Sequence, residues 1–342
     1  MLARLMSDAR PETAFAELLG GVSRTFALSI AELPRPLEGW VTSAYLLCRI
    51  VDTVEDRPDT TESDRQAMFD DLLAAIGPPV NADRCLRLLE RFGGRGQDDP
   101  CTQLMNRCGH VLVQVATYPA GVLDAIRRCA VEMIEGLRRT PLTTTGAGPR
   151  FVCTTLDDLE RYCHYAAGVV GMMLARLFDL HLGRDPASIA PERMEQARRF
   201  GRGLQLTNIV KDHPADLADG RVFIPPEAAT RCGLTPDVLL RPALPLPVRR
   251  LIVARAADHL DQALEYTLAY PAEATGIRLF CLQPLMMALL TLDRVLTHED
   301  VTPDDRPKIT REQVADVMAT SRQVVRDDAA IRRWYEAHRA GL

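Results

Sequence analysis

Apolar residues recur with the period of an α-helix along most of the chain, and the stretch 45–56 carries an unusual polar stripe. In its sequence, YLLCRIVDTVED, helical spacing places Tyr45, Arg49, Asp52 and Asp56 on one line. The other positions are mostly Leu, Ile and Val, so we predict a helix that is buried nearly all round. Two carboxylates one turn apart on a buried helix repel each other and are costly to bury, which favours a cation bound between them.

A second stretch, 203–216, has the same design. In GLQLTNIVKDHPAD, the polar residues Gln205, Asn208, Asp212 and Asp216 recur among apolar neighbours at nearly helical spacing. Pro214 lacks a backbone donor and crowds the preceding turn, so we predict that the helix kinks or ends there. The direction of Asp216 therefore does not follow from helical spacing alone.

The remaining pattern predicts further helices and no convincing run of strands. The first helix is expected over 11–31, and the last over 310–340. The loops are short, so we predict a single all-α domain over 1–342, a helical bundle around a central cavity with a catalytic core of about 12–297.

Composition narrows the class of protein. The formal net charge of −5 gives no basic surface of the kind that binds nucleic acid. Nine cysteines without a CxxC pair argue against a disulfide framework or a structural zinc site, and for a reducing compartment. The first residues have no signal-peptide core, and no uninterrupted apolar run is long enough to span a bilayer. We expect a cytoplasmic protein that is soluble or peripherally associated with a membrane.

Carboxylates without a histidine or cysteine cluster favour a hard cation. Magnesium is usually held by one or two protein carboxylates, with waters and substrate phosphates completing its coordination. The two aspartate motifs therefore predict a magnesium-bridged diphosphate, with Arg49 and Lys211 close enough in sequence to neutralise phosphate oxygens. A charged rim over an apolar cavity fits a prenyl diphosphate, whose ionisation leaves an allylic cation that must be kept from water.

Structural alternatives exist for each of these residues. A lone DxxxD pair is most often a solvated helix face, but two such pairs on apolar helices have no cheap structural explanation. Tyr45 and Tyr162 are more often core tyrosines. Gly168 and Gly171 most often permit close helix packing, and we interpret His213 as a surface residue.

These motifs resemble the squalene/phytoene synthase family, which joins two prenyl diphosphates head to head. The resemblance runs from SRTFALSI at Ser23 to KITRE at Lys308, and its most specific pieces are YLLCRIVDTVED, YCHYAAGVVG and GLQLTNIVKD. Within the family, DTVED, the YCHY and AGVVG block and LFCLQPLMMALLTL are more similar to the squalene synthase branch than to phytoene synthases.

The resemblance implies an isoprenoid synthase fold and a role for each matching residue. Magnesium would be held by the aspartates of both motifs together with Glu55 and Asn208. Tyr162 matches a tyrosine thought to assist proton transfer or to steer the cation. The remaining matches are positions that bind the diphosphates or line the prenyl tunnels: Ser23, Arg24, Thr25, Phe26, Tyr45, Arg49, Ala166, Val170, Gly171, Leu204, Gln205, Asn208 and Lys211.

The implied activity has two parts. Two molecules of farnesyl diphosphate would condense to presqualene diphosphate, and NADPH-dependent reductive rearrangement would then give squalene, on a route to sterols or hopanoids. No GxGxxG motif follows a strand, so an NADPH site would be of another kind, with Lys308 and Arg311 as phosphate contacts.

Alternatives to this activity stay open. One is a non-reducing head-to-head synthase that makes presqualene diphosphate, dehydrosqualene or phytoene. A more distant one is a non-catalytic helical assembly protein, which should have lost the aspartates.

The sequence departs from the family pattern at two points. In DHPAD, Ala215 stands where the family usually has an acidic residue. The C-terminal membrane anchor of the eukaryotic members is also missing from this sequence, which favours a soluble form.

Overall fold

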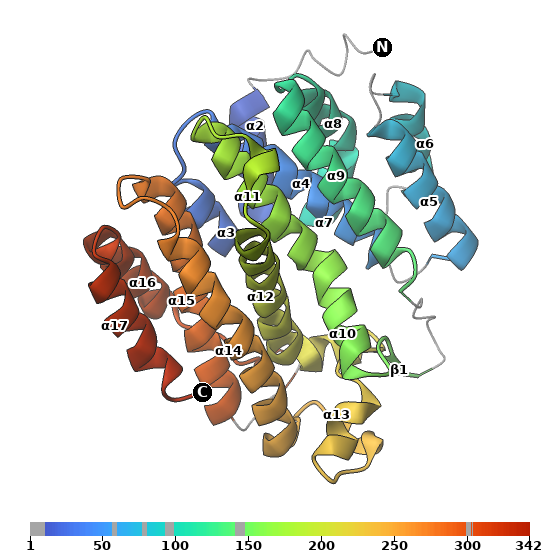
Figure 1. The fold of residues 1–342 in the computed structure, drawn as a ribbon. Helices are drawn as coiled ribbons and strands as arrows, with labels where there is room; N and C mark the ends of the chain where they lie inside the picture. Colours follow the sequence, from blue (N-terminus) through green and yellow to red (C-terminus); the bar gives the residue numbers. More distant parts are fainter. Residues whose placement is uncertain are drawn as a thin grey trace. The chain divides into compact units, whose positions relative to one another are not determined.

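The computed structural model describes residues 11–56, 60–76, 81–92, 99–140, 148–298, 302 and 304–342. Over these residues the chain is mainly helical with almost no strand, which confirms the predicted all-α class (Figure 1). The chain forms two compact units: Met1–Arg139 with Met172–Ile189, and Thr140–Gly171 with Ala190–Leu342. The single domain expected from the short loops stays a prediction.

The first unit is built from helices that surround one apolar helix. Its elements are α2 (Pro11–Val22), α3 (Arg24–Ile30), α4 (Leu37–Glu55), α5 (Glu62–Ala75), α6 (Ala82–Phe92), α7 (Pro100–Asn106), α8 (Cys108–Ala116), α9 (Ala120–Leu137), most of α11 (Val169–His181), and the short 3₁₀ helix η2 (Pro186–Ser188). Helix α4 packs against α2, α7, α8 and α9. Its residues Leu46, Leu47, Ile50, Val51 and Val54 are all fully buried, as the apolar pattern predicts.

The helix expected over 11–31 forms as two helices. Ser23 has extended backbone angles (φ −159°, ψ 99°), and its side chain accepts a hydrogen bond from the backbone N–H of Phe26. A serine hydroxyl that satisfies a free N–H in this way caps the N-terminus of a new helix. The local capping interaction therefore ends α2 and starts α3, although the hydrophobic period continues across both.

The second unit is built around α12. Its elements are β1 (Arg150–Phe151), α10 (Leu156–Cys163), the π-helix η1 (His164–Gly168), α12 (Pro191–Ala218), β2 (Arg221–Val222), α13 (Pro226–Arg231), η3 (Pro236–Leu240), α14 (Leu246–Leu268), α15 (Thr275–Thr297), α16 (Arg311–Val324) and α17 (Asp328–Arg339). Helix α12 packs against α14, α15 and η1. The helix expected over 310–340 forms as α16 and α17, because Asp327 interrupts it and caps α17 through the N–H of Ala330.

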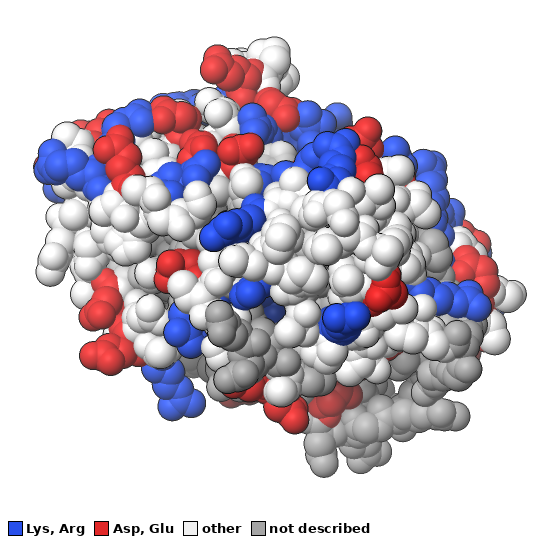
Figure 2. Space-filling view, turned by 90° about the horizontal axis from the view of Figure 1, so that it is seen from below, with Lys and Arg blue, Asp and Glu red and all other residues white. Residues whose placement is uncertain are grey.

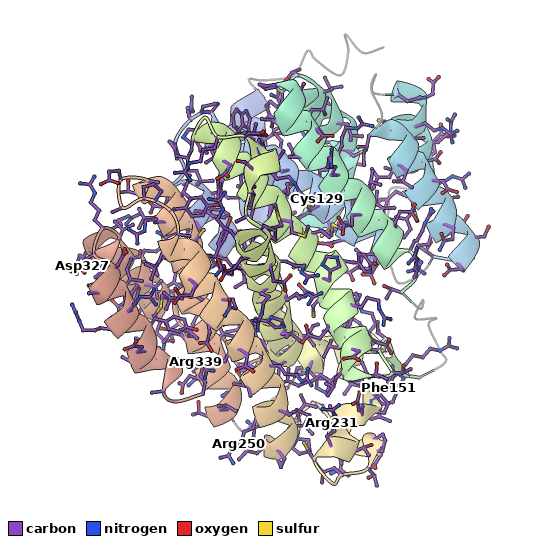
Figure 3. All side chains as sticks on the ribbon, in the orientation of Figure 1. Cys129, Phe151, Arg231, Arg250, Asp327 and Arg339 are labelled. Carbon is purple, nitrogen blue, oxygen red and sulfur yellow. The ribbon has the colours of Figure 1, made fainter. Side chains whose placement is uncertain are left out.

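Strands are confined, in the described residues, to one two-residue parallel pair in which Arg150 is opposite Arg221 and Phe151 is opposite Val222. This pair lies beside the start of α10, where Figure 3 labels Phe151. On the other side of the unit, Arg339 of α17 donates to Asp261 of α14 at 2.9 Å and so ties the C-terminal helix to the core (Figure 3). The all-α prediction is unaffected, because two residues form no layer of their own.

Among the described helices, α15 alone is long and apolar enough to cross a membrane. Of its apolar 18-residue stretch, 78% is buried inside the protein. Burial of this kind is what a core helix requires. All nine cysteines are free thiols in the structure, and seven of them are buried. On the face shown in Figure 2, basic and acidic side chains are interspersed among wide uncharged areas.

Candidate active site

The first aspartate motif lies in the last turn of α4. The helix ends at Glu55, and Asp56 caps it, with helical angles and its N–H bonded to the carbonyl oxygen of Asp52 at 2.8 Å. Asp52 and Asp56 therefore keep the one-turn spacing that the sequence predicts. Asp56 is exposed, Asp52 is half-buried and Glu55 is buried, so the motif marks the point where a buried helix reaches solvent.

The charge of Asp52 is only partly compensated. Arg49 lies 3.1 Å from its carboxylate, and a quarter of the Asp52 side chain is exposed. Burial is the largest influence on the group and raises the pKa; the Arg49 guanidinium opposes this rise, and the negative charge of Asp56 adds to it, which leaves the pKa of Asp52 at about 7. A carboxylate that is difficult to ionise despite an arginine neighbour is one that a further cation would stabilise.

Residues from the start of α3 gather beside this helix. The hydroxyl of Tyr45 is hydrogen-bonded to the side chain of Ser23, and burial raises the pKa of that hydroxyl. The rings of Phe26 and Tyr45 stack with their centroids 5.5 Å apart. Thr25 is exposed, and the side chain of Arg24 lies outside the described side chains. Ser23, Phe26, Tyr45, Arg49 and Asp52 thus form one continuous set of contacts in the first unit.

The second aspartate motif lies inside α12, which continues through Pro214 to Ala218. Of the two outcomes predicted at Pro214, an end of the helix is wrong and a kink stays a prediction. The helix continues because this turn is buried: Pro214 and His213 are both buried, and His213 Nε2 bonds the backbone oxygen of Arg241 at 3.0 Å. Tertiary contacts therefore hold the turn that the missing N–H weakens. His213 is not the expected surface residue. Asp212 and Asp216 lie one turn apart, as do the aspartates of the first motif.

Basic side chains meet the carboxylates of this second motif. Lys211 Nζ lies 3.1 Å from one oxygen of Asp212 and donates to Asn208 at 3.0 Å. Arg306, which precedes α16, donates to the other oxygen of Asp212 at 2.8 Å. Arg221 lies 3.6 Å from Asp216.

Arg221 returns toward α12 because of the turn that precedes it. Gly220 has φ +79°, a conformation that L side chains rarely adopt, and it follows directly on the C-terminal cap of α12. The next residues form β2. The Arg221 guanidinium lies 5.5 Å from the ring centroid of Phe223, whose ring packs on that of Tyr162 at 4.9 Å. A chain of contacts thus joins Asp216 to Tyr162 of α10 in the second unit.

Gly171 has a packing role that the sequence anticipates for the GVVG pair. A Cβ on Gly171 would lie 2.1 Å from the backbone oxygen of Ala197, and one on Gly201 would lie 2.1 Å from that of Ala167. The segment 167–171 and α12 therefore touch backbone to backbone. Ala166, Val170, Leu204 and Gln205 are half-buried along the same two segments, and their expected place in a prenyl tunnel stays a prediction.

Lys308 and Arg311 are both exposed, just before and at the start of α16. Their role as cofactor contacts stays a prediction. Two basic residues that the sequence argument did not single out, Arg221 and Arg306, contact the carboxylates of the second motif. Arg221 follows Gly220 directly after α12, and this Gly-Arg pair is a local sign of a turn back toward the helix. The sequence around Arg306 gives no sign of its partner Asp212, which is 94 residues away.

The residues of both motifs fit magnesium. Among the described residues, no group of three or more His, Cys, Asp or Glu side chains is arranged to hold a metal ion. Each motif instead offers two aspartates one turn apart, and magnesium commonly takes one or two protein carboxylates and completes its octahedron with waters and phosphate oxygens. Burial, and after it the charge of Asp56, raises the pKa of Asp52 although Arg49 lies beside it, and a bound cation would oppose both influences.

Comparisons with known proteins identify the family. A family profile described as squalene/phytoene synthase matches residues 19–313. Squalene synthases of Schizosaccharomyces pombe and Homo sapiens are 28% and 27% identical to this chain, each over 83% of it. The matches cover 60% and 63% of those proteins, so the chain spans about three fifths of the length of the relatives that it matches.

Solved structures show the same fold. The structure of TcSQS with a ligand matches with a TM-score of 0.73 at 23% identity, and the match covers 96% of this chain and 90% of the TcSQS chain. A dehydrosqualene synthase, also with a ligand, has a TM-score of 0.63 at 20% identity and covers 92% and 96%. The squalene synthase HpnC of Alicyclobacillus acidocaldarius has a TM-score of 0.53 at 22% identity and covers 81% and 91%.

The family profile covers most of the sequence and includes both aspartate motifs. The chain therefore belongs to the squalene/phytoene synthase family.

Proposed function

We propose that this chain is a squalene synthase, which joins two molecules of farnesyl diphosphate to presqualene diphosphate and reduces that intermediate to squalene. Family membership supports the head-to-head condensation. Both sequence relatives named above are squalene synthases, which favours squalene as the product. This route leads to sterols or hopanoids.

The observation that carries the proposal is the placement of two acidic pairs, one at the end of the buried helix α4 and one beside an apolar stretch of α12. Asp52 and Asp56 end the buried helix α4, and Asp212 and Asp216 lie on α12 among buried neighbours. Like charges one turn apart repel each other and favour a bound cation, a place that Lys211, Arg306 and Arg221 take beside the second pair. Bound magnesium would neutralise a diphosphate and so make it a better leaving group.

The protein's own side chains would bind and orient the substrate around that chemistry. Arg49, Lys211 and Arg221 already lie against the aspartates and would pair with phosphate oxygens, because guanidinium and ammonium groups form short, charge-assisted hydrogen bonds with them. Ser23 and the stacked rings of Phe26 and Tyr45 offer a hydroxyl and an apolar wall to one substrate. Glu55 and Asn208 would support the metal ions.

The aromatic pair in the second unit suits the allylic cation. Tyr162 packs on Phe223, and the faces of aromatic rings attract positive charge without acting as nucleophiles. The half-buried residues Ala166, Val170 and Leu204 would line the prenyl chains and exclude water.

NADPH would supply the hydride of the final step. Lys308 and Arg311 are exposed basic residues three positions apart and would contact its phosphates. We also propose a cytoplasmic location with peripheral membrane contact, because both the substrate chains and squalene are lipids.

One incubation tests the proposal. The purified chain is given magnesium with farnesyl or geranylgeranyl diphosphate, with and without NADPH, and the extracted lipids are identified by mass spectrometry. We expect squalene from farnesyl diphosphate and NADPH, and presqualene diphosphate without NADPH. Dehydrosqualene or phytoene as the end product in the presence of NADPH would contradict the reductive step, whereas no coupled product under any condition would contradict the head-to-head synthase itself.

A further inference from the structure

Asp212 is held by two cationic side chains, one on each carboxylate oxygen. Arg306 donates to Oδ1 at 2.8 Å, and Lys211 Nζ lies 3.1 Å from Oδ2. The side chains of Arg306 and Asp212 are 27% and 26% exposed, so the pair is partly shielded from solvent and from salt. This carboxylate therefore already has the positive charge that a metal ion would bring.

The two cations are attached to the protein in different ways. Lys211 is the neighbour of Asp212 on α12 and also bonds Asn208, so the helix fixes its position. Arg306 comes from the segment between α15 and α16, far away in sequence. The guanidinium of Arg306 thus reaches Asp212 from outside α12, whereas Lys211 stays beside Asp212 on the same helix.

Local interactions give Arg306 a defined starting position. The N–H of Asp305 donates to the hydroxyl of Thr302 at 2.9 Å, and the N–H of Thr302 donates to the carbonyl oxygen of Asp305 at 3.1 Å. The carboxylate of Asp305 lies 3.5 Å from the ring of His298. Pro307, on the other side of Arg306, is buried. Thr310 then caps α16 through a reciprocal pair of hydrogen bonds with Gln313. The described residues on both sides of Arg306 thus hold its guanidinium beside Asp212.

A metal ion and a guanidinium compete for the same carboxylate oxygen. Magnesium binds oxygen donors at about 2.0–2.1 Å, well inside the space that Arg306 takes up. When Asp212 ligates a metal, Arg306 loses Asp212 as its ion-pair partner. Its guanidinium can then pair with the oxygens of a neighbouring diphosphate, whose geometry it matches well.

We propose that Arg306 competes with the metal ion for Asp212 and transfers to a diphosphate oxygen once metal and diphosphate are bound. This inference rests on the proposed function. It makes Arg306 a diphosphate-binding residue that keeps metal affinity low without substrate and raises diphosphate affinity once the metal is bound.

The test separates metal affinity from diphosphate affinity. Titration calorimetry with Mn²⁺ alone, and then with inorganic pyrophosphate at saturating Mg²⁺, is run on the wild-type chain and on Arg306→Gln, Arg306→Lys and Arg326→Gln. Arg326 is an exposed arginine between α16 and α17 and serves as the charge-matched control. The Mn²⁺ binding that Asp212→Asn removes identifies the second motif, and thermal melting by circular dichroism establishes that each variant is folded.

Arg306→Gln should tighten Mn²⁺ binding about threefold to fivefold, the worth of a partly exposed ion pair. It should weaken pyrophosphate binding about tenfold or more, the worth of a hydrogen bond to a charged group. Compared with Arg306→Gln, Arg306→Lys should recover part of the competition with Mn²⁺ but a smaller part of the pyrophosphate affinity. Arg326→Gln should change neither affinity.

Two outcomes overturn the inference in different ways. If Asp212→Asn weakens Mn²⁺ binding while Arg306→Gln changes neither affinity, or weakens Mn²⁺ binding as well, the exchange is wrong and the proposed function stands. If Asp212→Asn leaves Mn²⁺ binding at the wild-type level, the second motif is not a metal site and the proposed function fails with the inference.

Discussion

The close crossing of α12 and the segment 167–171 makes a substitution at Gly201 the sharpest test of the second unit. A Cβ at this position would lie 2.1 Å from the backbone oxygen of Ala167 and 2.6 Å from its carbonyl carbon. Carbon and oxygen atoms of neighbouring helices normally approach to about 3.3 Å. Gly201→Ala therefore requires the two backbones to separate by about 1 Å, since neither contact atom belongs to a flexible side chain.

The magnitude follows from two opposing effects. Forcing extra volume into a packed contact costs about 1–3 kcal/mol, and a backbone neighbour puts this case at the upper end. Alanine is a better helix former than glycine by about 1 kcal/mol, which offsets part of the cost. We expect a net loss of about 2 kcal/mol and a fall in melting temperature of about 4–8 °C for a unit of this size.

Thermal melting followed by circular dichroism measures the loss, and Gly39→Ala is the matched control. Gly39 lies in the first turn of α4, where an added Cβ would meet only the hydroxyl of Tyr118, at 3.9 Å. That variant should be unchanged or more stable by up to about 1 kcal/mol. A Gly201→Ala protein that melts at or above the wild-type temperature would show that the helices have room to spare and would refute the packing argument.

Two further substitutions test local charge arrangements. Asp71 is almost fully buried; burial acts to raise its pKa, but hydrogen bonds from Arg84, Arg91 and Arg87 outweigh this and hold the pKa below its ordinary value. A carboxylate with a depressed pKa stabilises the fold above about pH 4, and this contribution is lost as the pH falls further. Asp71→Asn should therefore lower the free energy of unfolding in urea by about 2 kcal/mol at pH 7, and by progressively less below about pH 4. Equal losses at about pH 7 and about pH 3 would contradict this. Asp56→Asn should lower the pKa of Asp52, because it removes a like charge one turn away, and carboxyl NMR titration of the metal-free protein checks the direction.

Features encoded by local spacing could be predicted from the sequence. The apolar pattern around 45–56 correctly indicates a buried helix, and its period places Asp52 and Asp56 one turn apart, as the structure has them. The small residues Gly168 and Gly171 indicate close packing, which the contact of Gly171 with the Ala197 backbone confirms.

Features that depend on distant parts of the chain could not be predicted. Pro214 looks like a helix terminus locally, but the buried contact of His213 with the backbone of Arg241 holds the helix through it. The hydroxyl of Ser23 ends one helix and begins another within a continuous hydrophobic pattern, and a capping geometry of this kind is not visible in the period. Arg306 reaches Asp212 from a loop whose sequence gives no sign of its partner.

The central claim, that both acidic pairs hold the metal that removes diphosphate from a prenyl chain, is tested most directly by the rate of diphosphate release from farnesyl diphosphate. The wild-type chain is compared with Asp52→Asn and Asp212→Asn at saturating Mg²⁺, with folding verified by circular dichroism. We predict that the wild-type rate depends on Mg²⁺ and that each substitution lowers it by about a hundredfold or more, the loss expected when an electrostatic contact to the departing group is removed. A folded Asp52→Asn or Asp212→Asn protein that releases diphosphate at the wild-type rate would contradict the account.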